Sequence, residues 1–337
     1  MEEMPMATTG SPSTEPTPEP APAVLAGKGV VLVTGAAGLV GSHTCRELVR
    51  RGWTVRAIVR SPTKAERRLA GVPVDIVLGD LRSSDTVRAA VRGVDAVVHL
   101  AAIAIEKRDE SYEDVNAAAT IAVLDAARTA GVRRFVQMSQ NGASSASPYR
   151  FLRSKGAAQD AVVASDLEWT VLRPSVIVGP EDEFVTVLAR LVRLSPLVYP
   201  LPGGGTAKFQ PVAVDDVARV IAVALERADS VRQTYPVGGP AALTLRQMIE
   251  RVLLAMHERR VLIPVPVALL HPLIAAAQHV LPRPPVTTSL LDLLAVDNTV
   301  GDMRVWTTFG LVPAPFAPEE LTYLQNITAR EAWNSLW

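Results

Sequence analysis

Short apolar runs alternate with longer amphipathic stretches along the first half of the chain. Runs such as Asp95-Ala96-Val97-Val98-His99-Leu100 are brief and rich in valine, and they predict buried strands. The predicted strands are 29–34, 54–59, 74–78, 95–100, 133–138 and 169–173, and the predicted helices are 39–51, 62–70, 83–92, 111–130 and 150–165. Continuously apolar strands joined by helices indicate a parallel sheet covered on both faces. We therefore expect an α/β fold with a doubly wound parallel sheet of the Rossmann type.

The pattern changes after about residue 175, where turns rich in glycine and proline appear. Helices are predicted near 183–194, 215–227 and 245–256, and a strand is predicted near 211–214. We assign residues 28–180 to the main domain, with elements near 208–238 returning to it. Residues 181–207 and 239–337 then form a smaller C-terminal lobe on the substrate side.

Two further segments need separate interpretations. Residues 1–27 are rich in Pro, Thr, Ser and Glu and contain no basic residue, so they predict a disordered tail rather than a signal peptide. Residues 261–281 are nearly all apolar, but three prolines divide them into runs far shorter than the ~20 residues of a membrane span. We expect a connector and a buried or surface-packed helix there, with a hydrophobic ligand or a peripheral membrane contact as the alternative.

Composition and charge narrow the classes of function. Lys and Arg total 34, as do Asp and Glu, so the net charge favours neither nucleic acid nor an anionic membrane as the main partner. The single cysteine, Cys45, allows no disulfide within the chain and indicates a reducing compartment, the cytoplasm. The sequence has no H-E-x-x-H motif or Cys/His cluster, so we predict no metal site.

The first predicted strand ends in three glycines spaced G-x-x-G-x-x-G, and a predicted helix follows. A strand, a glycine turn and a helix N-terminus in this order form the arrangement that binds a dinucleotide pyrophosphate. Gly35 permits the turn, Gly38 lets the backbone approach the phosphates, and Gly41 lets the helix pack on the strand. The predicted cofactor contacts here are Thr34, Gly35, Ala37, Gly38, Leu39, Val40 and Gly41.

The end of the second strand bears on the choice of nucleotide. An NAD site usually carries Asp or Glu there, which binds the ribose 2′-hydroxyl. This chain has Arg60, whose guanidinium can pair with a 2′-phosphate. We therefore predict NADP(H) in preference to NAD(H). Lys64, Arg67 and Arg68 follow, and we interpret them mainly as solvated charges.

Later strand ends supply further candidate contacts. After the third strand, Asp80 could accept a hydrogen bond from the adenine amino group, with Leu81 beside it. After the fourth strand, Leu100-Ala101-Ala102 contains small residues that would let the backbone approach the cofactor ribose, and Asn116 could support that turn. An isolated Asp at a strand end is commonly a turn residue, so the prediction rests on the order of these residues at successive strand ends.

Together these residues resemble the short-chain dehydrogenase/reductase superfamily in its extended and atypical, epimerase/dehydratase-like branches. The matching segments are Thr34–Gly41, Gly79–Leu81, His99–Ala102, Leu172–Ser175 and Val214–Ala218. A narrower resemblance, over Arg173–Phe184 and Gln210–Val217, is to the NADPH-binding accessory subunit of respiratory complex I and its bacterial relatives. The resemblance covers roughly residues 29–325, and it implies that Pro174, Ser175 and Val176 line the nicotinamide end of the site.

Reductases of this superfamily resemble one another in a Ser, Tyr and Lys group, with Tyr and Lys spaced Y-x-x-x-K on one face of a helix. There the Lys lowers the phenol pKa and holds the nicotinamide ribose, and the Tyr exchanges a proton as hydride moves. In this chain Lys155 matches the lysine, and Ser139 matches the serine to within a residue. Phe151 occupies the tyrosine position and cannot exchange a proton.

Three interpretations of this helix stay open. Tyr149 could replace the phenol from the preceding turn, Lys155 could act alone as acid or base, or Lys155 could only hold the ribose. The first hypothesis of function is accordingly an NADP(H)-binding protein whose cofactor is structural or sensory, linked to a partner complex or to a quinone- or lipid-related process at a membrane. The alternatives are an active NADPH-dependent reductase or epimerase on a small or apolar carbonyl substrate, and a redox-sensing regulatory module. We expect a cytoplasmic protein, with peripheral contact at the inner face of a membrane as an option and no nucleic-acid partner.

Overall fold

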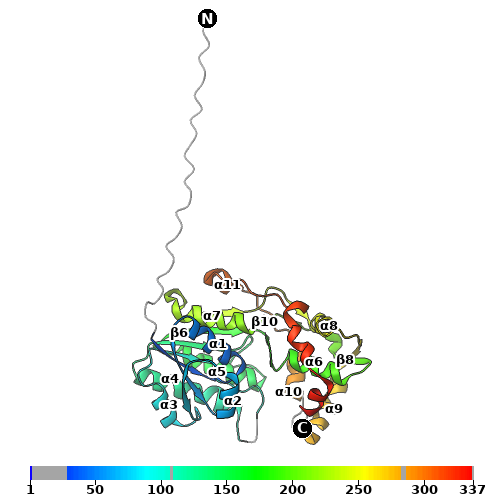
Figure 1. Cartoon of the computed structure of the whole chain (residues 1–337), viewed down its shortest axis with the longest axis horizontal. Helices are drawn as coiled ribbons and strands as arrows, with labels where there is room; N and C mark the ends of the chain where they lie inside the picture. The colour runs from blue at the N-terminus through cyan, green and yellow to red at the C-terminus, as the bar shows by residue number, and fades with distance from the viewer. Residues whose placement is uncertain (2–28, 107–108, 282–285, 336–337) are drawn as a thin grey trace.

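A parallel sheet of seven strands forms the core of the main domain, in the order β11-β6-β5-β4-β1-β2-β3; this domain occupies the left half of Figure 1. The computed structural model describes Met1 and residues 29–106, 109–281 and 286–335, so the tail predicted at 1–27 lies, apart from Met1, outside the described residues. The strands are β1 (Val30–Thr34), β2 (Thr54–Val59), β3 (Val74–Leu78), β4 (Ala96–His99), β5 (Arg134–Met138), β6 (Glu168–Pro174) and β11 (Gln233–Val237). The strand order reverses between β1 and β4, where ligands bind in sheets of this kind. The predicted doubly wound α/β fold is confirmed.

Helices cover both faces of the sheet. One face carries α1 (Leu39–Arg50), α2 (Pro62–Arg68), α7 (Val214–Glu226) and α11 (Arg304–Phe309). The other face carries α3 (Ser84–Ala90), a π-helical segment η1 (Glu113–Ala118) that continues as α4 (Ala119–Thr129), and α5 (Arg150–Val163). Because strand side chains alternate, Val31 and Val33 join the first core, and Leu32 joins the second.

The edge of the sheet at β11 differs from the sequence expectation. We predicted no separate strand there, but Gln233–Val237 pairs in parallel with β6. Pro236 lies within β11, and proline is tolerated in a sheet when the strand is an edge strand. Helix α11 packs beside β11 through a ring contact between Phe309 and Tyr235. Although residues 239–337 were assigned to the smaller lobe, α11 therefore belongs to the core of the main domain.

The smaller lobe lies beside the sheet, in the right half of Figure 1. Its helical elements are α6 (Val185–Leu194), α8 (Leu245–Ala255), α9 (Val267–Val280), α10 (Thr288–Leu294), η4 (Pro318–Asn326) and α12 (Ala329–Asn334). Two-stranded sheets join β7 (Ile177–Val178) to β10 (Val212–Ala213), β9 (Lys208–Phe209) to β12 (Leu243–Thr244), and β8 (Val198–Pro202) to β13 (Val261–Val265). Thr244 caps α8 through a capping box with Gln247, and the helix lies where the sequence predicts one.

The apolar segment at 261–281 forms strand β13 and then helix α9. No described side chain of α9 is buried, so this helix lies on the surface of the lobe. Among the described residues, no helix is long and apolar enough to cross a membrane.

Candidate functional site

The glycine turn joins β1 to α1 as a narrow cradle. Gly35 has a φ of 67°, and a side chain there would lie 2.9 Å from the backbone nitrogen of Ala101. A Cβ on Gly41 would overlap the carbonyl oxygen of Gly35, because α1 starts directly against the turn. Gly38 donates its N–H to Gly35 O at 2.9 Å. It is also the N-cap residue of α1, so this helix has no side-chain cap, and its first turn contains no acidic residue. The helix N-terminus is therefore suited to an anion, and these residues fit a pyrophosphate.

Behind the turn, a buried chain of hydrogen bonds fixes the ends of β1 and β4. Thr34 lies opposite His99 in the sheet, and its hydroxyl bonds to His99 Nδ1 at 2.9 Å. His99 Nε2 bonds to Thr120 at 2.9 Å, and burial lowers the pKa of His99 to about 3. The Thr34 hydroxyl also accepts the N–H groups of Leu100 and Ala101 at 3.1 and 3.2 Å. His99 is therefore a neutral core residue, and Thr34 shapes the loop that faces the cradle.

Charged side chains gather at the ends of β2 and β3, where the adenosine end of the cofactor is expected. Arg60 forms an ion pair with Glu110, from the segment before η1. Asp80 pairs with Arg82 at 2.8 Å, and this contact lowers the pKa of Asp80. Arg60 also contributes to that shift, so the two arginines belong to one cluster. The sequence interpretation missed Arg82 because its role comes from this pairing and not from a motif.

The other predicted basic residues divide between two places. Lys64 lies in the first turn of α2. Ser61 caps this helix, because its hydroxyl oxygen accepts the backbone N–H of Lys64 at 3.3 Å. Arg68 pairs with Glu181 at 2.8 Å, and Arg67 lies 3.5 Å from the same carboxylate. Glu181 follows β7, so Arg67 and Arg68 tie α2 to the start of the smaller lobe. Arg67 is exposed, as the interpretation of a solvated charge expects, whereas the side chain of Arg68 is largely buried by its contact with Glu181.

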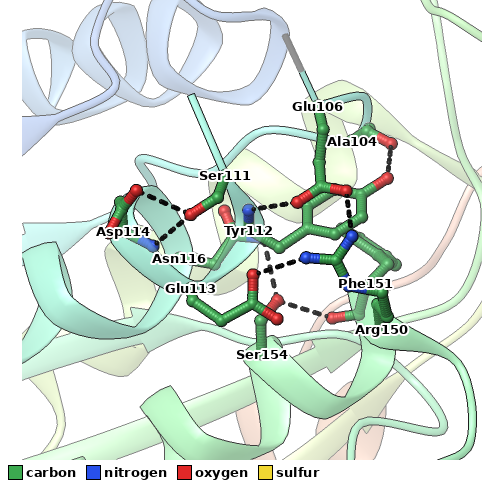
Figure 2. A network of polar contacts seen from close by, with 10 residues as sticks. All are labelled: Ala104, Glu106, Ser111, Tyr112, Glu113, Asp114, Asn116, Arg150, Phe151 and Ser154. Carbon is green, nitrogen blue, oxygen red and sulfur yellow. Dashed lines mark hydrogen bonds and ion pairs between the residues drawn. The ribbon is translucent and has the colours of Figure 1, made fainter. Parts of the chain in front are cut away.

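The loop after β4 is held by one buried amide. Asn116, in η1, accepts the N–H of Ile103 at 2.8 Å and donates to Ile103 O at 3.2 Å. Its amide also donates to Ser154 Oγ on α5 at 3.1 Å (Figure 2). Asn116 therefore supports the turn that contains Leu100, Ala101 and Ala102, as the sequence suggests. Leu100 is buried, Ala101 is half-buried and Ala102 is exposed.

Pro174, Ser175 and Val176 lead from β6 to β7, at the expected nicotinamide end. Pro174 and Ser175 are buried, and Val176 is half-buried. The Ser175 hydroxyl donates to the carbonyl oxygen of Asn298 at 2.5 Å and accepts the N–H of Gln210 at 3.3 Å. This hydroxyl is thus committed to the protein, so it stabilises the turn.

Lys155 and Ser139 lie together at the carboxyl end of β5. Lys155 is 5% exposed, and its Nζ donates to the carbonyl oxygen of Met138 at 2.7 Å. Burial lowers the pKa of Lys155 to about 8. Ser139 is 2% exposed, and its hydroxyl has no hydrogen-bond partner within the described part of the chain. A buried hydroxyl without a partner is unfavourable, so the pair fits a site completed by a bound polar group.

Phe151 occupies the tyrosine position of α5 and makes an aromatic contact there. The ring of Phe151 packs edge-on against Tyr112, with centroids 5.6 Å apart. The Tyr112 hydroxyl donates to Ala104 O at 2.8 Å, so this phenol is committed to the loop (Figure 2). Arg150 pairs with Glu106 at 2.7 Å and Glu113 at 2.9 Å, which ties α5 to the same loop.

Tyr149, the other candidate phenol, precedes α5 as its N-cap residue and is half-buried. Its side chain makes no hydrogen bond that would orient it among the described residues. Lys155 lies almost two helical turns further along. The structure therefore places Ser139 beside the Lys155 anchor but gives Tyr149 no comparable position.

Residues 35–228 match the family described as NAD(P)H-binding. The chain belongs to this family. Within it, this NAD(P)H-binding protein is similar to subunits of mitochondrial NADH dehydrogenase [ubiquinone] and NADH-ubiquinone oxidoreductase. Among the described residues, no group of three His, Cys, Asp or Glu side chains could hold a metal ion.

Several relatives carry names from different processes. The mitochondrial NADH dehydrogenase [ubiquinone] 1 alpha subcomplex subunit 9 of Arabidopsis thaliana is 34% identical over 253 residues, which cover 71% of this chain and 61% of that protein. A ceramide reductase of Caulobacter vibrioides is 33% identical over 192 residues, or 57% of this chain and 59% of that protein. The chain therefore spans about three fifths of the length of these relatives.

Solved structures of low identity share the fold. UDP-glucose 4-epimerase of Thermus thermophilus, in complex with NAD, has a TM-score of 0.67 at 23% identity and covers 90% of this chain and 99% of that one. This likeness supports the fold of the whole described molecule, including the smaller lobe.

Proposed function

We propose that this protein holds NADP(H) as a resident cofactor that stabilises its fold within a partner complex, and does not turn it over by the phenol-dependent reaction of related reductases. The observation that carries the proposal is Phe151 in the tyrosine position, packed against Tyr112. A bound nicotinamide would supply hydride chemistry, but the Phe151 ring has no proton to exchange. Lys155 and Ser139 would then hold the nucleotide and satisfy their own buried polar groups.

The choice of NADP(H) over NAD(H) is part of the same proposal. Arg60 and Arg82 provide two guanidinium groups at the end where a 2′-phosphate would lie. The names of the NADH dehydrogenase subunits among the relatives support a protein complex as partner. Contact of that complex with the inner face of a membrane is part of the proposal.

Retention of the nucleotide tests this function. The protein is purified without added nucleotide and denatured, and the released nucleotide is identified and counted by chromatography. We expect close to one NADP(H) per chain, exchanging with isotopically labelled NADPH over hours. Phe151→Tyr and Phe151→Leu should retain it equally, because neither change touches the glycine cradle. Exchange within seconds, or a chain purified empty, would contradict a resident cofactor.

A second candidate is an active NADPH-dependent reductase of an apolar carbonyl compound. Its support is the lowered pKa of Lys155, about 8, which makes this ammonium group a proton donor close to neutral pH. The relatives include proteins named ceramide reductase and NAD(P)H azoreductase. In this case Lys155 would give its proton to the forming alkoxide, and Ser139 would donate a hydrogen bond to the same oxygen.

This candidate predicts a rate that depends on pH. The acid form of Lys155 is required, so kcat/KM for NADPH oxidation with decanal should fall as the pH rises through about 8. Lys155→Met should lower kcat/KM at least about 100-fold, whereas Tyr149→Phe should leave it unchanged. Equal activity of wild type and Lys155→Met would eliminate the lysine as the acid.

A further inference from the structure

The smaller lobe contains an apolar pocket that is separate from the glycine cradle. It has a volume of about 240 Å³ and lies between α6, β8, α8, α9 and α10. Its walls are mainly aliphatic and include Val187, Leu188, Leu191, Ile249, Ile274 and Leu294. An apolar protein cavity of about 150 Å³ is large enough to bind benzene. This pocket is therefore large enough for an apolar ligand.

The distribution of the lining residues indicates an elongated shape. On α9 and its end, the lining runs from Leu270 to Leu281, which is about 16 Å at 1.5 Å per residue. On α6 and its flanks it runs from Phe184 to Ser195, a similar length. The apolar lining thus extends over about 16 Å on each of two helices, a length that an extended acyl chain can follow. Such a shape fits an unbranched chain better than a fused ring system.

A polar group inside the pocket points to an amphiphilic ligand. Tyr199 lines the pocket and is 2% exposed, and its hydroxyl makes no hydrogen bond with the described part of the chain. Buried tyrosine hydroxyls usually find a partner, so this one is available to a polar atom of the ligand. Glu183, also part of the lining, is exposed and marks the side open to solvent.

The helix that covers the pocket is itself apolar on its outer side. Leu270, Ile274 and Ala277 face the pocket, whereas Leu269 and Leu273 are exposed. Helix α9 contains no Asp, Glu, Lys or Arg. A cover with apolar side chains on both sides suits a ligand that arrives from a lipid surface.

We propose that this pocket binds the acyl chain of a lipid, with α9 as its cover. The chain would lie between α6 and α9, and a hydroxyl or carbonyl group of the lipid would pair with Tyr199. The proposal does not depend on the fate of the cofactor, because the glycine cradle contributes no lining residue. Loss of lipid binding and loss of nucleotide binding are therefore separate results.

Saturated fatty acids of increasing length test the pocket in the unmodified protein. Titration calorimetry with hexanoic, octanoic, decanoic and dodecanoic acid should give one site per chain. Affinity should rise about fourfold per methylene, equivalent to about 0.8 kcal/mol, until the pocket is filled. Absence of saturable binding, or an affinity independent of length, would overturn the proposal.

Two neighbouring alanines of α9 provide a matched pair of variants. Ala277 lines the pocket, and Ala276 is exposed on the same helix. Ala277→Phe should weaken dodecanoic acid binding at least tenfold, and Ala276→Phe should change it less than twofold. NADPH affinity, unchanged in both, reports an intact fold. Equal losses of dodecanoic acid affinity in the two variants would indicate that the fatty acid binds the outer face of α9. That result would overturn the proposal that it binds in the pocket. Flotation with phosphatidylcholine vesicles then distinguishes a membrane lipid from a free fatty acid as the source.

Discussion

At the scale of single residues, the Arg60–Glu110 ion pair lies where the proposed 2′-phosphate would bind. Arg60 is half-exposed at the end of β2, and Glu110 is buried, so their pairing occupies the guanidinium that the phosphate needs. A bound 2′-phosphate would have to compete with the Glu110 carboxylate for Arg60. If the site prefers NADP(H) as proposed, Glu110 would reduce the size of that preference.

Charge changes at this pair should alter the choice of nucleotide. Glu110→Gln should tighten NADPH binding about two- to fivefold, the scale of one partly exposed ion pair, and leave NADH binding unchanged. Arg60→Asp should reverse the preference between the two nucleotides. Fluorescence titration of NADPH and NADH measures both constants. Glu66→Gln, an exposed carboxylate on α2, is the matched control, and an equal gain there would attribute the effect to net charge.

Spacing in the sequence predicted the place of Arg60 at the end of β2, but it did not predict that Arg82 and Glu110 lie beside it. Arg60 is found by counting from Gly41, because the length of one helix and one strand is nearly constant. Arg82 and Glu110 belong to two different loops that the fold brings close to Arg60. No periodic pattern in the sequence predicts that these loops lie together. Phe151 could be identified from the sequence because it lies four residues before Lys155 on the same helix, so no tertiary contact is needed to relate them.

At the scale of elements, a buried arginine joins β5 and β6 to the end of α7. The guanidinium of Arg134 donates to Leu225 O at 3.2 Å, to Thr170 Oγ1 at 2.7 Å and to Ser230 Oγ at 2.8 Å. Burial lowers its pKa to about 10, which still leaves it charged at neutral pH. The positive charge lies against the C-terminal carbonyl groups of α7, the negative end of the helix dipole.

Removing this arginine should therefore destabilise the whole sheet. Arg134→Met should lower the free energy of unfolding by about 3 kcal/mol or more, because several buried acceptors lose their donor. Arg133→Met is the matched control, since Arg133 is exposed and pairs with Glu168 at the surface. It should cost no more than about 1 kcal/mol. Urea unfolding measures both, and similar losses would show that Arg134 does not act through its buried contacts.

Most strands and helices of the main domain follow from the hydrophobic pattern, whereas a few elements, among them η1 and β11, do not. The π-helical turn at η1 cannot be separated from a regular helix by periodicity, although it holds Asn116 in place. Strand β11 was missed because Pro236 and two polar residues interrupt a short apolar run. Its pairing with β6 depends on a tertiary contact.

At the scale of the whole molecule, a few polar contacts join the two lobes near the expected nicotinamide end. Gln210 donates to Gly239 O at 2.8 Å and accepts the N–H of Val300 at 2.9 Å. Asn141, after β5, donates to the side chain of Asn298 at 2.9 Å. These partners are far apart in the sequence, so spacing could not predict them. A nucleotide bound beside Ser175 would contact the segment that both lobes share.

The edge of the sheet at β11 has a consequence for how copies of this chain meet. An edge strand offers free N–H and carbonyl groups on which another chain can add a strand, a common start of aggregation. Pro236 removes one N–H from this edge, and Arg304 donates to the carbonyl oxygen of Thr234 at 3.0 Å while covering the ring of Tyr235. These two features oppose strand addition on this side of the sheet, so we expect this edge to disfavour aggregation between crowded copies.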